Sequence, residues 1–226
     1  MFNKAIQNRK LERNPLKGVK LLRENNERER VLSAEEWEAY RANCPPWYLP
    51  VAVTAYRTAM RKSEIANLSP SRVVLNEEFI RLRPEDTKTG NGRSIPIHPE
   101  LMEILRDALN GGCSNNGNVF HRDCDPVNAG DIRRAHRSTC KKAKIENFTF
   151  HNFRHTCINN WRKEGHDYFR IMAVSGHKTI SVFKRYNLVD ERELKSLVNG
   201  KDRHKENKNS ELLPQSPLPQ LSIHPN

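Results

Sequence analysis

The chain has 226 residues, of which 36% are hydrophobic, so it can bury one sizeable core. Its 39 Lys and Arg outnumber its 27 Asp and Glu, and the net charge of +12 favours a polyanionic partner, with nucleic acid first. No apolar run approaches the ~20 residues of a membrane span, and the N-terminus lacks the apolar core of a secretory signal. We therefore expect a cytoplasmic protein with no membrane association.

The five cysteines are odd in number and widely spaced, with no Cys-x-x-Cys pair. Neither a disulfide framework nor a zinc knuckle is indicated by this pattern. His121 and Cys124 do lie three residues apart, but no second pair stands at ligand spacing. Packing is therefore favoured over a metal site there, and no metal is predicted.

The N-terminal residues 1–30 hold nine Lys or Arg against four acids, with a break at the string NPLKG. They predict a short helix, a turn and a charged linker, too polar to form a domain. Ser33 and Glu36 then stand at capping-box spacing, with Leu32 and Trp37 placed as a hydrophobic staple. The compact domain is expected to begin here.

The next elements are two helices and a hairpin. Pro50 begins an apolar helix whose exit carries Arg61, and a successor begins near Ser63. Two alternating apolar pairs flank a Gly-Asn-Gly turn at residues 90–92: Ile80 with Leu82, and Ile95 with Ile97. This pattern predicts a β-hairpin with Lys88 near its turn, and Pro96 indicates that the second strand lies on a sheet edge.

The C-terminal half is predicted to be helical. A helix opens at His98 and ends at Gly111, a second covers residues 131–144, a third covers 150–164, and a fourth runs from Asp167 to Gly176. The second carries a basic stripe of Arg133, Arg137, Lys141 and Lys144. That stripe is either a solvated face or a phosphate-binding face, and the spacing does not decide between them. Residues 201–226 contain four prolines and almost no apolar pattern, which predicts a disordered tail.

Several polar residues are ordinary when each is considered alone. In the helix FHNFRHTCINNW, His151, Arg154 and His155 share one face. Arg61 could simply pair with Glu64, and a histidine beside a glycine turn, His177, is weak evidence. A lone tyrosine such as Tyr186 packs more often than it reacts. These residues become informative only through the order in which they occur.

In chain order the sequence reads AMRKSEIANL, TKTGNGRSIPI, TFHNFRHTCINNWRKEG and SGHKTISVFKRYN. Over about residues 30–198 it resembles the tyrosine recombinases, the phage-integrase family of DNA strand-exchange enzymes. The resemblance implies an α+β fold, a mainly helical catalytic domain with a small antiparallel β-sheet, or hairpin, at one edge. It assigns the catalytic domain to residues 31–200. It reads residues 1–30 as the last helix and linker of a core-binding domain that is otherwise missing.

Carried over residue by residue, the resemblance implies that Arg61 and Arg154 hold the scissile phosphate and that Lys88 is the general acid. His151 and His177 complete the cluster, and Tyr186 is the nucleophile. Two arginine forks suit the charged oxygens of a phosphodiester, and a phenol with a pKa of about 10 needs a base or cations to attack.

The resemblance also places Glu64 at an acidic position that supports the first arginine, and gives His155 a structural role. Ala59 departs from the pattern, because the family commonly has glycine there. No metal or cofactor is implied. The implied partners are double-stranded DNA and further copies of the chain in a tetramer on DNA, in a bacterial or phage-encoded protein associated with the nucleoid. Two alternatives remain: a non-catalytic DNA-binding remnant of an integrase, or a relaxer like type IB topoisomerases.

Overall fold

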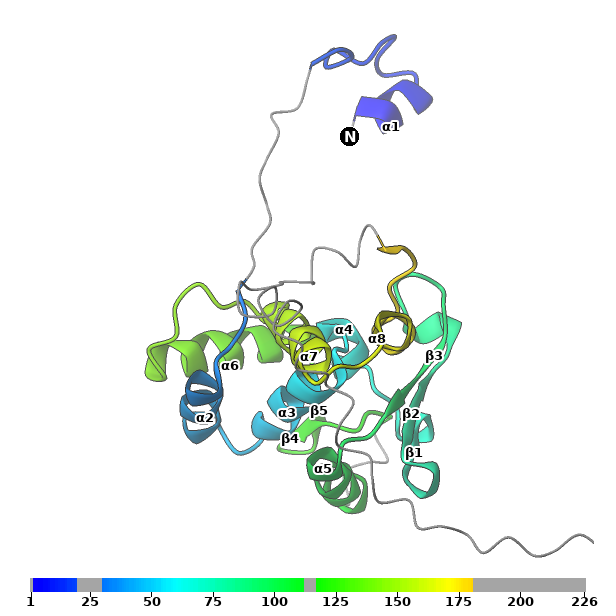
Figure 1. Cartoon of the computed structure of the whole chain (residues 1–226). Helices are drawn as coiled ribbons and strands as arrows, with labels where there is room; N and C mark the ends of the chain where they lie inside the picture. The colour runs from blue at the N-terminus through cyan, green and yellow to red at the C-terminus, as the bar shows by residue number, and fades with distance from the viewer. Residues whose placement is uncertain (1, 20–29, 112–116, 181–226) are drawn as a thin grey trace, which may run out of the picture.

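The computed structural model of the chain describes residues 2–19, 30–111 and 117–180 (Figure 1). The described part is mostly helical, with a small antiparallel sheet, so the predicted fold class is confirmed. Tyr186, the segment that follows it and the tail at 201–226 lie outside the described residues. The first helix, α1 (Phe2–Gln7), is the short N-terminal helix expected from the sequence.

Helix α2 (Ala34–Ala42) begins at the predicted capping box. The Ser33 hydroxyl accepts a hydrogen bond from the Glu36 amide at 3.2 Å, and the Glu36 carboxylate accepts one from the Ser33 amide at 3.0 Å. These bonds satisfy amides that the first turn would otherwise leave open. Leu32 and Trp37 are both buried, as expected for the staple.

Helix α3 (Leu49–Thr58) starts with a proline in its first turn and is almost wholly buried. It ends at Ala59, whose backbone is left-handed with φ 52°. Arg61 is then the N-cap of the short helix α4 (Lys62–Ala66), so the predicted break near Ser63 is confirmed to within a residue. A left-handed alanine costs about 1–2 kcal/mol, which explains why glycine suits this position.

The sheet has the order β1-β2-β3 and is antiparallel throughout. Strands β2 (Phe79–Leu82) and β3 (Arg93–Pro96) form the predicted hairpin, in which Ile80 pairs with Ile95. Strand β3 lies on the edge, as Pro96 indicated. The sequence did not predict β1 (Val73–Val74), which has only two residues. The hairpin connection includes the single turn η3 (Pro84–Asp86), and η1 (Pro70–Arg72) and η2 (Leu75–Glu77) flank β1.

Helix α5 (Pro99–Asn110) is followed by a two-stranded ribbon, β4 (His121–Arg122) and β5 (Asp125–Pro126), and by α6 (Ala129–Lys142). The basic helix begins and ends two residues earlier than predicted. Lys144 lies beyond it in a left-handed turn with φ 55°, so it does not continue the stripe of Arg133, Arg137 and Lys141. The chain reverses there because Ile145 donates its amide to the Cys140 carbonyl at 2.9 Å.

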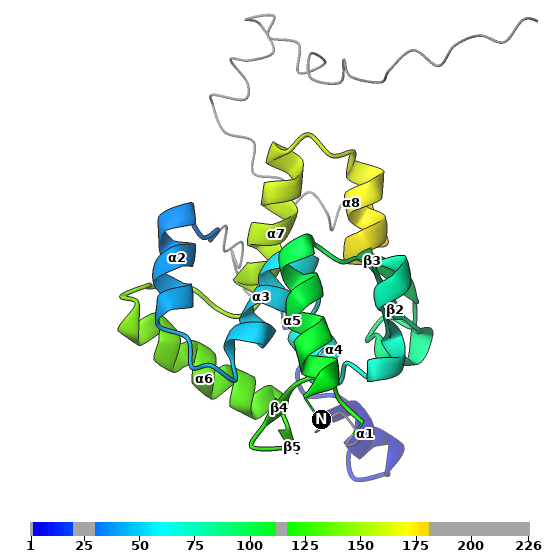
Figure 2. The same ribbon diagram turned by 90° about the horizontal axis from the view of Figure 1, so that it is seen from below.

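Helices α7 (Asn152–Lys163) and α8 (Tyr168–Ser175) complete the described fold. As predicted, Asp167 caps α8 and Gly176 ends it in the left-handed conformation. Figures 1 and 2 show α3 near the centre, where it contacts α4, α5 and α7, while α8 lies beside α7 and against β3. Consequently the ends of α3 and α8, the start of α4 and the first turns of α7 come together.

Two further findings concern cysteines and membranes. Cys44, Cys140 and Cys157 are free thiols, whereas Cys124 is disulfide-bonded, which the cysteine spacing did not indicate. The spacing of the cysteines in the sequence alone could not predict that Cys124 forms a disulfide. Within the described ranges, none of the helices is long and apolar enough to cross a membrane.

Candidate active site

Arg154 is a deeply buried charged residue, with only 2% of its surface exposed. It projects from the first turn of α7. Its Nη1 donates to the Ala59 carbonyl at 2.7 Å, and its Nη2 donates to the Ser175 carbonyl at 2.6 Å. The guanidinium thus bridges the end of α3 and the end of α8, which fixes its plane in space.

His177 meets the same guanidinium. Its Nε2 lies 3.1 Å from Arg154 Nη2, and its Nδ1 lies 2.8 Å from the Ser175 hydroxyl. Because a guanidinium only donates, Nε2 accepts and Nδ1 carries the proton. Burial, followed by the positive charges of Arg154 and Arg61, lowers the pKa of His177 to about 3. The imidazole is therefore neutral at physiological pH.

Arg61, Glu64 and Arg93 form what we call the charged cluster. Glu64 Oε1 accepts from Arg61 Nη1 at 2.9 Å and from Arg93 Nη1 at 3.1 Å. Glu64 Oε2 accepts from Arg93 Nη2 and from the Arg61 amide, each at 2.7 Å. One buried carboxylate therefore holds two arginines and caps α4. This places Glu64 against the first predicted arginine.

His151 stands at the start of α7, where its ring lies 5.4 Å from that of His155. His151 keeps exposed surface, yet partial burial and the positive charges of Arg154 and Arg61 hold its pKa below the usual range. The pKa of His155 falls to about 4, through burial and then through His151 and Arg154. Both rings are therefore neutral at physiological pH.

Lys88 is exposed on the hairpin connection, in line with its predicted place near the turn. Its neighbour Thr89 accepts a hydrogen bond from Lys178 Nζ at 3.2 Å, and Lys178 follows His177 directly. The connection that carries Lys88 is thereby held beside the end of α8. Gly92 allows this shape, because a Cβ there would lie 2.8 Å from the Leu82 carbonyl.

The structure thus brings five predicted residues into one neighbourhood and sets Lys88 beside it. The pKa of His177 responds to Arg61, His151 and Arg154 together, and Glu64 binds Arg61. Tyr186 lies outside the described residues, so its place relative to this group stays a prediction. The basic residues of α6 are exposed, and their role also stays a prediction.

Sequence reasoning missed Arg93. It belongs to the quoted string TKTGNGRSIPI, but a single arginine on an alternating strand indicates a solvent-facing side chain. In the structure its side chain is only 5% exposed, since Glu64 and the end of α8 cover it. The buried carboxylate of Glu64 binds Arg93 as well as Arg61. Only the tertiary contacts reveal that Arg93 is this second partner.

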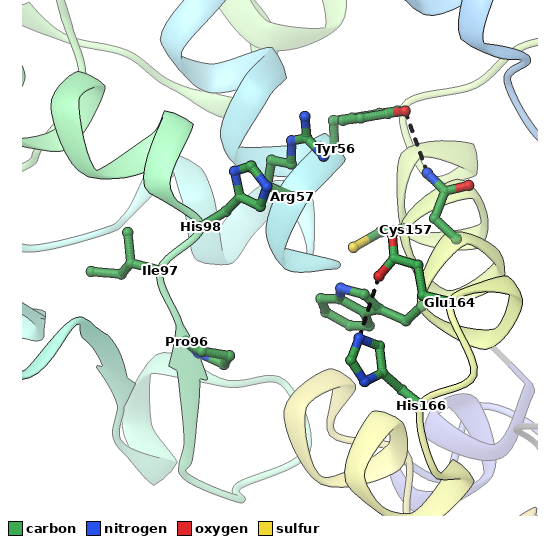
Figure 3. Close-up of a pocket in the computed structure, with 10 residues that line it drawn as sticks. Tyr56, Arg57, Pro96, Ile97, His98, Cys157, Glu164 and His166 are labelled. Carbon is green, nitrogen blue, oxygen red and sulfur yellow. Dashed lines mark hydrogen bonds and ion pairs between the residues drawn. The ribbon is translucent and has the colours of Figure 1, made fainter. Parts of the chain in front are cut away.

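A pocket of about 270 Å³ lies away from these residues, between the end of α3, the start of α5 and the C-terminal half of α7 (Figure 3). Trp161 and Cys157 line it, and His166 Nε2 lies 3.3 Å from Glu164 Oε2 at its rim. None of the predicted site residues lines this pocket. Within the described part of the chain no cluster of three or more His, Cys, Asp or Glu could hold a metal ion.

Comparison with known proteins defines the class. The model of the phage integrase family matches residues 29–193, well over half of the chain. The chain belongs to this family, and its described fold is that of a tyrosine recombinase catalytic domain.

Individual relatives agree. The chain is 31% identical over 133 residues to the shufflon-specific DNA recombinase of Escherichia coli, covering 58% of this chain and 32% of that protein. The crystal structure of XerA recombinase superimposes with a TM-score of 0.65 at 23% identity, covering 75% of this chain and 64% of that one. A lambda integrase dimer bound to a core site gives 0.67 at 20% identity, covering 85% and 70%. The match to the shufflon-specific DNA recombinase therefore covers only about a third of that protein's length.

Proposed function

We propose that the chain is the catalytic part of a site-specific DNA recombinase or integrase that cleaves and rejoins strands through a 3′-phosphotyrosine intermediate. The observation that carries this proposal is the convergence of Arg61, His151, Arg154 and His177 from three separate helical segments. Two permanently charged forks and two imidazoles in one place suit a phosphodiester. Family membership supports the same chemistry.

Arg61 and Arg154 bind the non-bridging oxygens of the scissile phosphate. In-line attack on a phosphodiester builds negative charge on these oxygens, and preorganised donors stabilise that charge most when they need not move. Arg154 meets this condition because two backbone carbonyls and a histidine already fix it. Arg61 meets it because Glu64 holds its guanidinium and its amide.

Tyr186 supplies the nucleophile. Its phenolic oxygen forms the bond to phosphorus while the bond from phosphorus to the 5′ oxygen breaks. His151, which its lowered pKa keeps neutral, accepts the phenolic proton, and Lys88 gives a proton to the departing 5′ oxygen. The products are a 3′-phosphotyrosine and a free 5′-hydroxyl. A second 5′-hydroxyl reverses the step, so the reaction joins strands without an external energy source.

His177 donates a hydrogen bond to the phosphate. In the DNA-free state its Nε2 instead accepts from Arg154. Arrival of the phosphate turns the imidazole from the fixed guanidinium toward the anion and raises the pKa of the ring, because a negative charge favours the protonated form. Phosphate binding thus converts an acceptor into a donor at the same atom.

The partners follow from the same chemistry. Double-stranded DNA is the substrate, and the net charge of +12 supports its binding. Residues 31–200 form the catalytic domain, residues 1–30 are a remnant of the last helix and linker of a core-binding domain, and four copies assemble on DNA. The relative solved as a dimer on a core site supports assembly on DNA.

Trapping a covalent complex tests the proposal. On a nicked suicide substrate, whose short cleaved strand diffuses away, the wild type should accumulate a protein–DNA adduct, and Tyr186→Phe should form none. Persistence of the adduct in Tyr186→Phe would remove the nucleophile. Binding without any adduct, even with a core-binding domain supplied in trans, would favour a non-catalytic remnant, and relaxation of supercoiled plasmid by a monomer would favour a relaxer.

The same assay tests Lys88 separately. Lys88→Ala should slow cleavage of ordinary DNA by about 10²- to 10⁴-fold but barely slow cleavage of a substrate with a 5′-thiolate leaving group, which departs without a proton. Equal losses on both substrates would exclude the general-acid role.

A further inference from the structure

Arg93 is an arginine buried at the junction of three elements. Its Nη1 and Nη2 donate to the two oxygens of Glu64 at 3.1 and 2.7 Å, and its Nε donates to the Val174 carbonyl near the end of α8 at 2.9 Å. Strand β3 therefore connects through one side chain to α4 and to α8. These three bonds fix both the position and the plane of the guanidinium.

Stability alone does not explain this pair. The side chains of Arg93 and Glu64 are 5% and 1% exposed. Burying an ion pair costs desolvation that its attraction only roughly offsets, so a buried pair is weak evidence for a stabilising role. Burial alone would raise the pKa of Glu64, but the hydrogen bonds and charges of Arg93 and Arg61 hold it below the usual range. The carboxylate therefore stays charged and keeps both arginines.

Gly176 packs directly on the Arg93 side chain. A Cβ at Gly176 would lie 3.1 Å from Arg93 Cδ and 3.4 Å from its Nε, and the backbone there has φ 75°. The next residue is His177, whose ring faces Arg154. The Arg93 side chain thus packs against the turn at Gly176 that precedes His177.

We propose that Arg93 is a positioning residue for strand cleavage: through Glu64 it sets the guanidinium of Arg61, and through Val174 and Gly176 it sets the turn that carries His177. The proposal rests on the function proposed above. Arg93 itself does not touch the phosphate, because all of its nitrogens already face Glu64 and α8. A lysine cannot replace it, since an ammonium offers no planar fork for two oxygens and a carbonyl at once.

Single-turnover cleavage separates positioning from folding. At saturating DNA, the rate constant measures how fast the folded molecules cleave, and the amplitude measures what fraction of the molecules is folded. Arg93→Lys should lower the rate constant by about 10- to 100-fold, the loss expected when a binding group is misplaced by about 1 Å. DNA affinity and amplitude should change little, because no contact to DNA is removed.

A control exists in Arg57 of α3, whose Nη2 pairs with Glu100 Oε2 at 2.7 Å. Arg57→Lys likewise replaces an arginine that is paired with a glutamate in the same chain, and it should leave the rate constant unchanged. A double-mutant cycle adds a second test. Because one of its two routes runs through Glu64, the Arg93→Gln/Glu64→Gln variant should lose less than the product of the two single losses.

A measurement that does not depend on catalysis tests the positioning role of Arg93 separately from the proposed strand-cleavage function. Nitrogen NMR of arginine side chains in the DNA-free protein should show hindered rotation of the Arg61 guanidinium in the wild type and faster rotation in Arg93→Lys. An unchanged Arg61 signal, a wild-type rate constant in Arg93→Lys, or multiplying losses in the double variant would each overturn the positioning role. Absence of an adduct in the wild type would instead overturn the proposed function, and the NMR comparison would still decide about Arg93.

Discussion

The charged cluster has a neutral counterpart in the core. Tyr40, Tyr48 and His136 form what we call the neutral cluster, in which the hydroxyls of the two tyrosines lie 2.9 Å apart and Tyr40 Oη lies 2.8 Å from His136 Nδ1. His136 Nε2 faces the Phe148 carbonyl at 3.0 Å. A carbonyl only accepts, so Nε2 carries the proton and the hydrogen bonds run in one direction from Tyr48 to Phe148.

The two clusters differ in what they can contribute. The neutral cluster joins α2, the start of α3, α6 and the segment before α7 by hydrogen bonds worth about 1 kcal/mol each, with no charge to desolvate. The charged cluster joins α4, β3 and α8 at a greater desolvation cost. We infer that the neutral cluster stabilises the fold, whereas the charged cluster is kept because it places charges for chemistry.

The largest effect is expected at Arg154. Arg154→Lys keeps a positive charge but loses the fork that bonds Ala59 and Ser175, and it should slow adduct formation by about 10²- to 10³-fold. Single-turnover cleavage at saturating DNA measures this loss. Arg162→Lys is the control, since Arg162 is a buried arginine of the same helix that bonds Asn159 instead. Equal losses of cleavage rate in both variants would mean that replacing any buried arginine of α7 slows cleavage, and that the position of Arg154 has no special role.

The neutral cluster should show the opposite behaviour. Tyr40→Phe leaves the Tyr48 hydroxyl and His136 Nδ1 without their partner and should lower the free energy of unfolding by about 1–3 kcal/mol. The cleavage rate constant of the folded molecules should not change. Chemical denaturation and single-turnover kinetics on the same sample check both statements. A slower rate constant at full folding would erase the distinction between the clusters.

Acid sharpens the comparison further. Burial lowers the pKa of His136 to about 4, whereas in an unfolded chain it is about 6.5. The contribution of His136 is therefore complete above about pH 6.5 and is lost as the pH falls toward about 4, because the unfolded chain binds the extra proton. Between about pH 7.5 and pH 5 this amounts to about 2 kcal/mol.

The variant His136→Phe isolates that contribution, since His155 and His177 also have lowered pKa values and remain in place. It should be less stable than the wild type at neutral pH but lose less stability on acidification. Denaturation curves at several pH values provide the measurement. Parallel profiles for the two proteins would mean that His136 is not the group responsible.

The smallest effects are expected on α6. Arg137→Ala should weaken DNA binding modestly and reduce the slope of log affinity against log salt by about one, as for one phosphate contact. Lys144→Ala should do less, because Lys144 has left the helix. Fluorescence anisotropy over a range of salt concentrations measures both, with Arg106→Ala on α5 as control. Identical slopes for all three variants would indicate that α6 presents only a solvated face.

Local signals in the sequence predicted much of the fold. The capping box at Ser33, the β-hairpin of β2 and β3, and the α8 boundaries at Asp167 and Gly176 are all confirmed. Each depends on residues close in sequence, where capping, alternation and glycine geometry act directly. The end of α6 was misplaced because a left-handed lysine leaves no sequence signal.

The site was only partly predictable. Arg61 and Arg154 were assigned to the candidate site because their spacing and order resemble a known family, and that resemblance gave no contact for Arg93. Tyr40 and His136 were invisible for a related reason, since they lie 96 residues apart and satisfy each other only after folding. Polar groups at buried positions look like breaks in a pattern until their partners are known.

The most direct measurement is to identify the amino acid that becomes linked to DNA. After reaction with the suicide substrate, the adduct is digested with protease and nuclease, and the nucleotide-bearing peptide is sequenced by mass spectrometry. We predict a single modified peptide that carries the nucleotide through its 3′ phosphate on Tyr186, and its near absence in Arg154→Lys. A nucleotide on any other residue, or an undiminished yield in Arg154→Lys, would contradict the account.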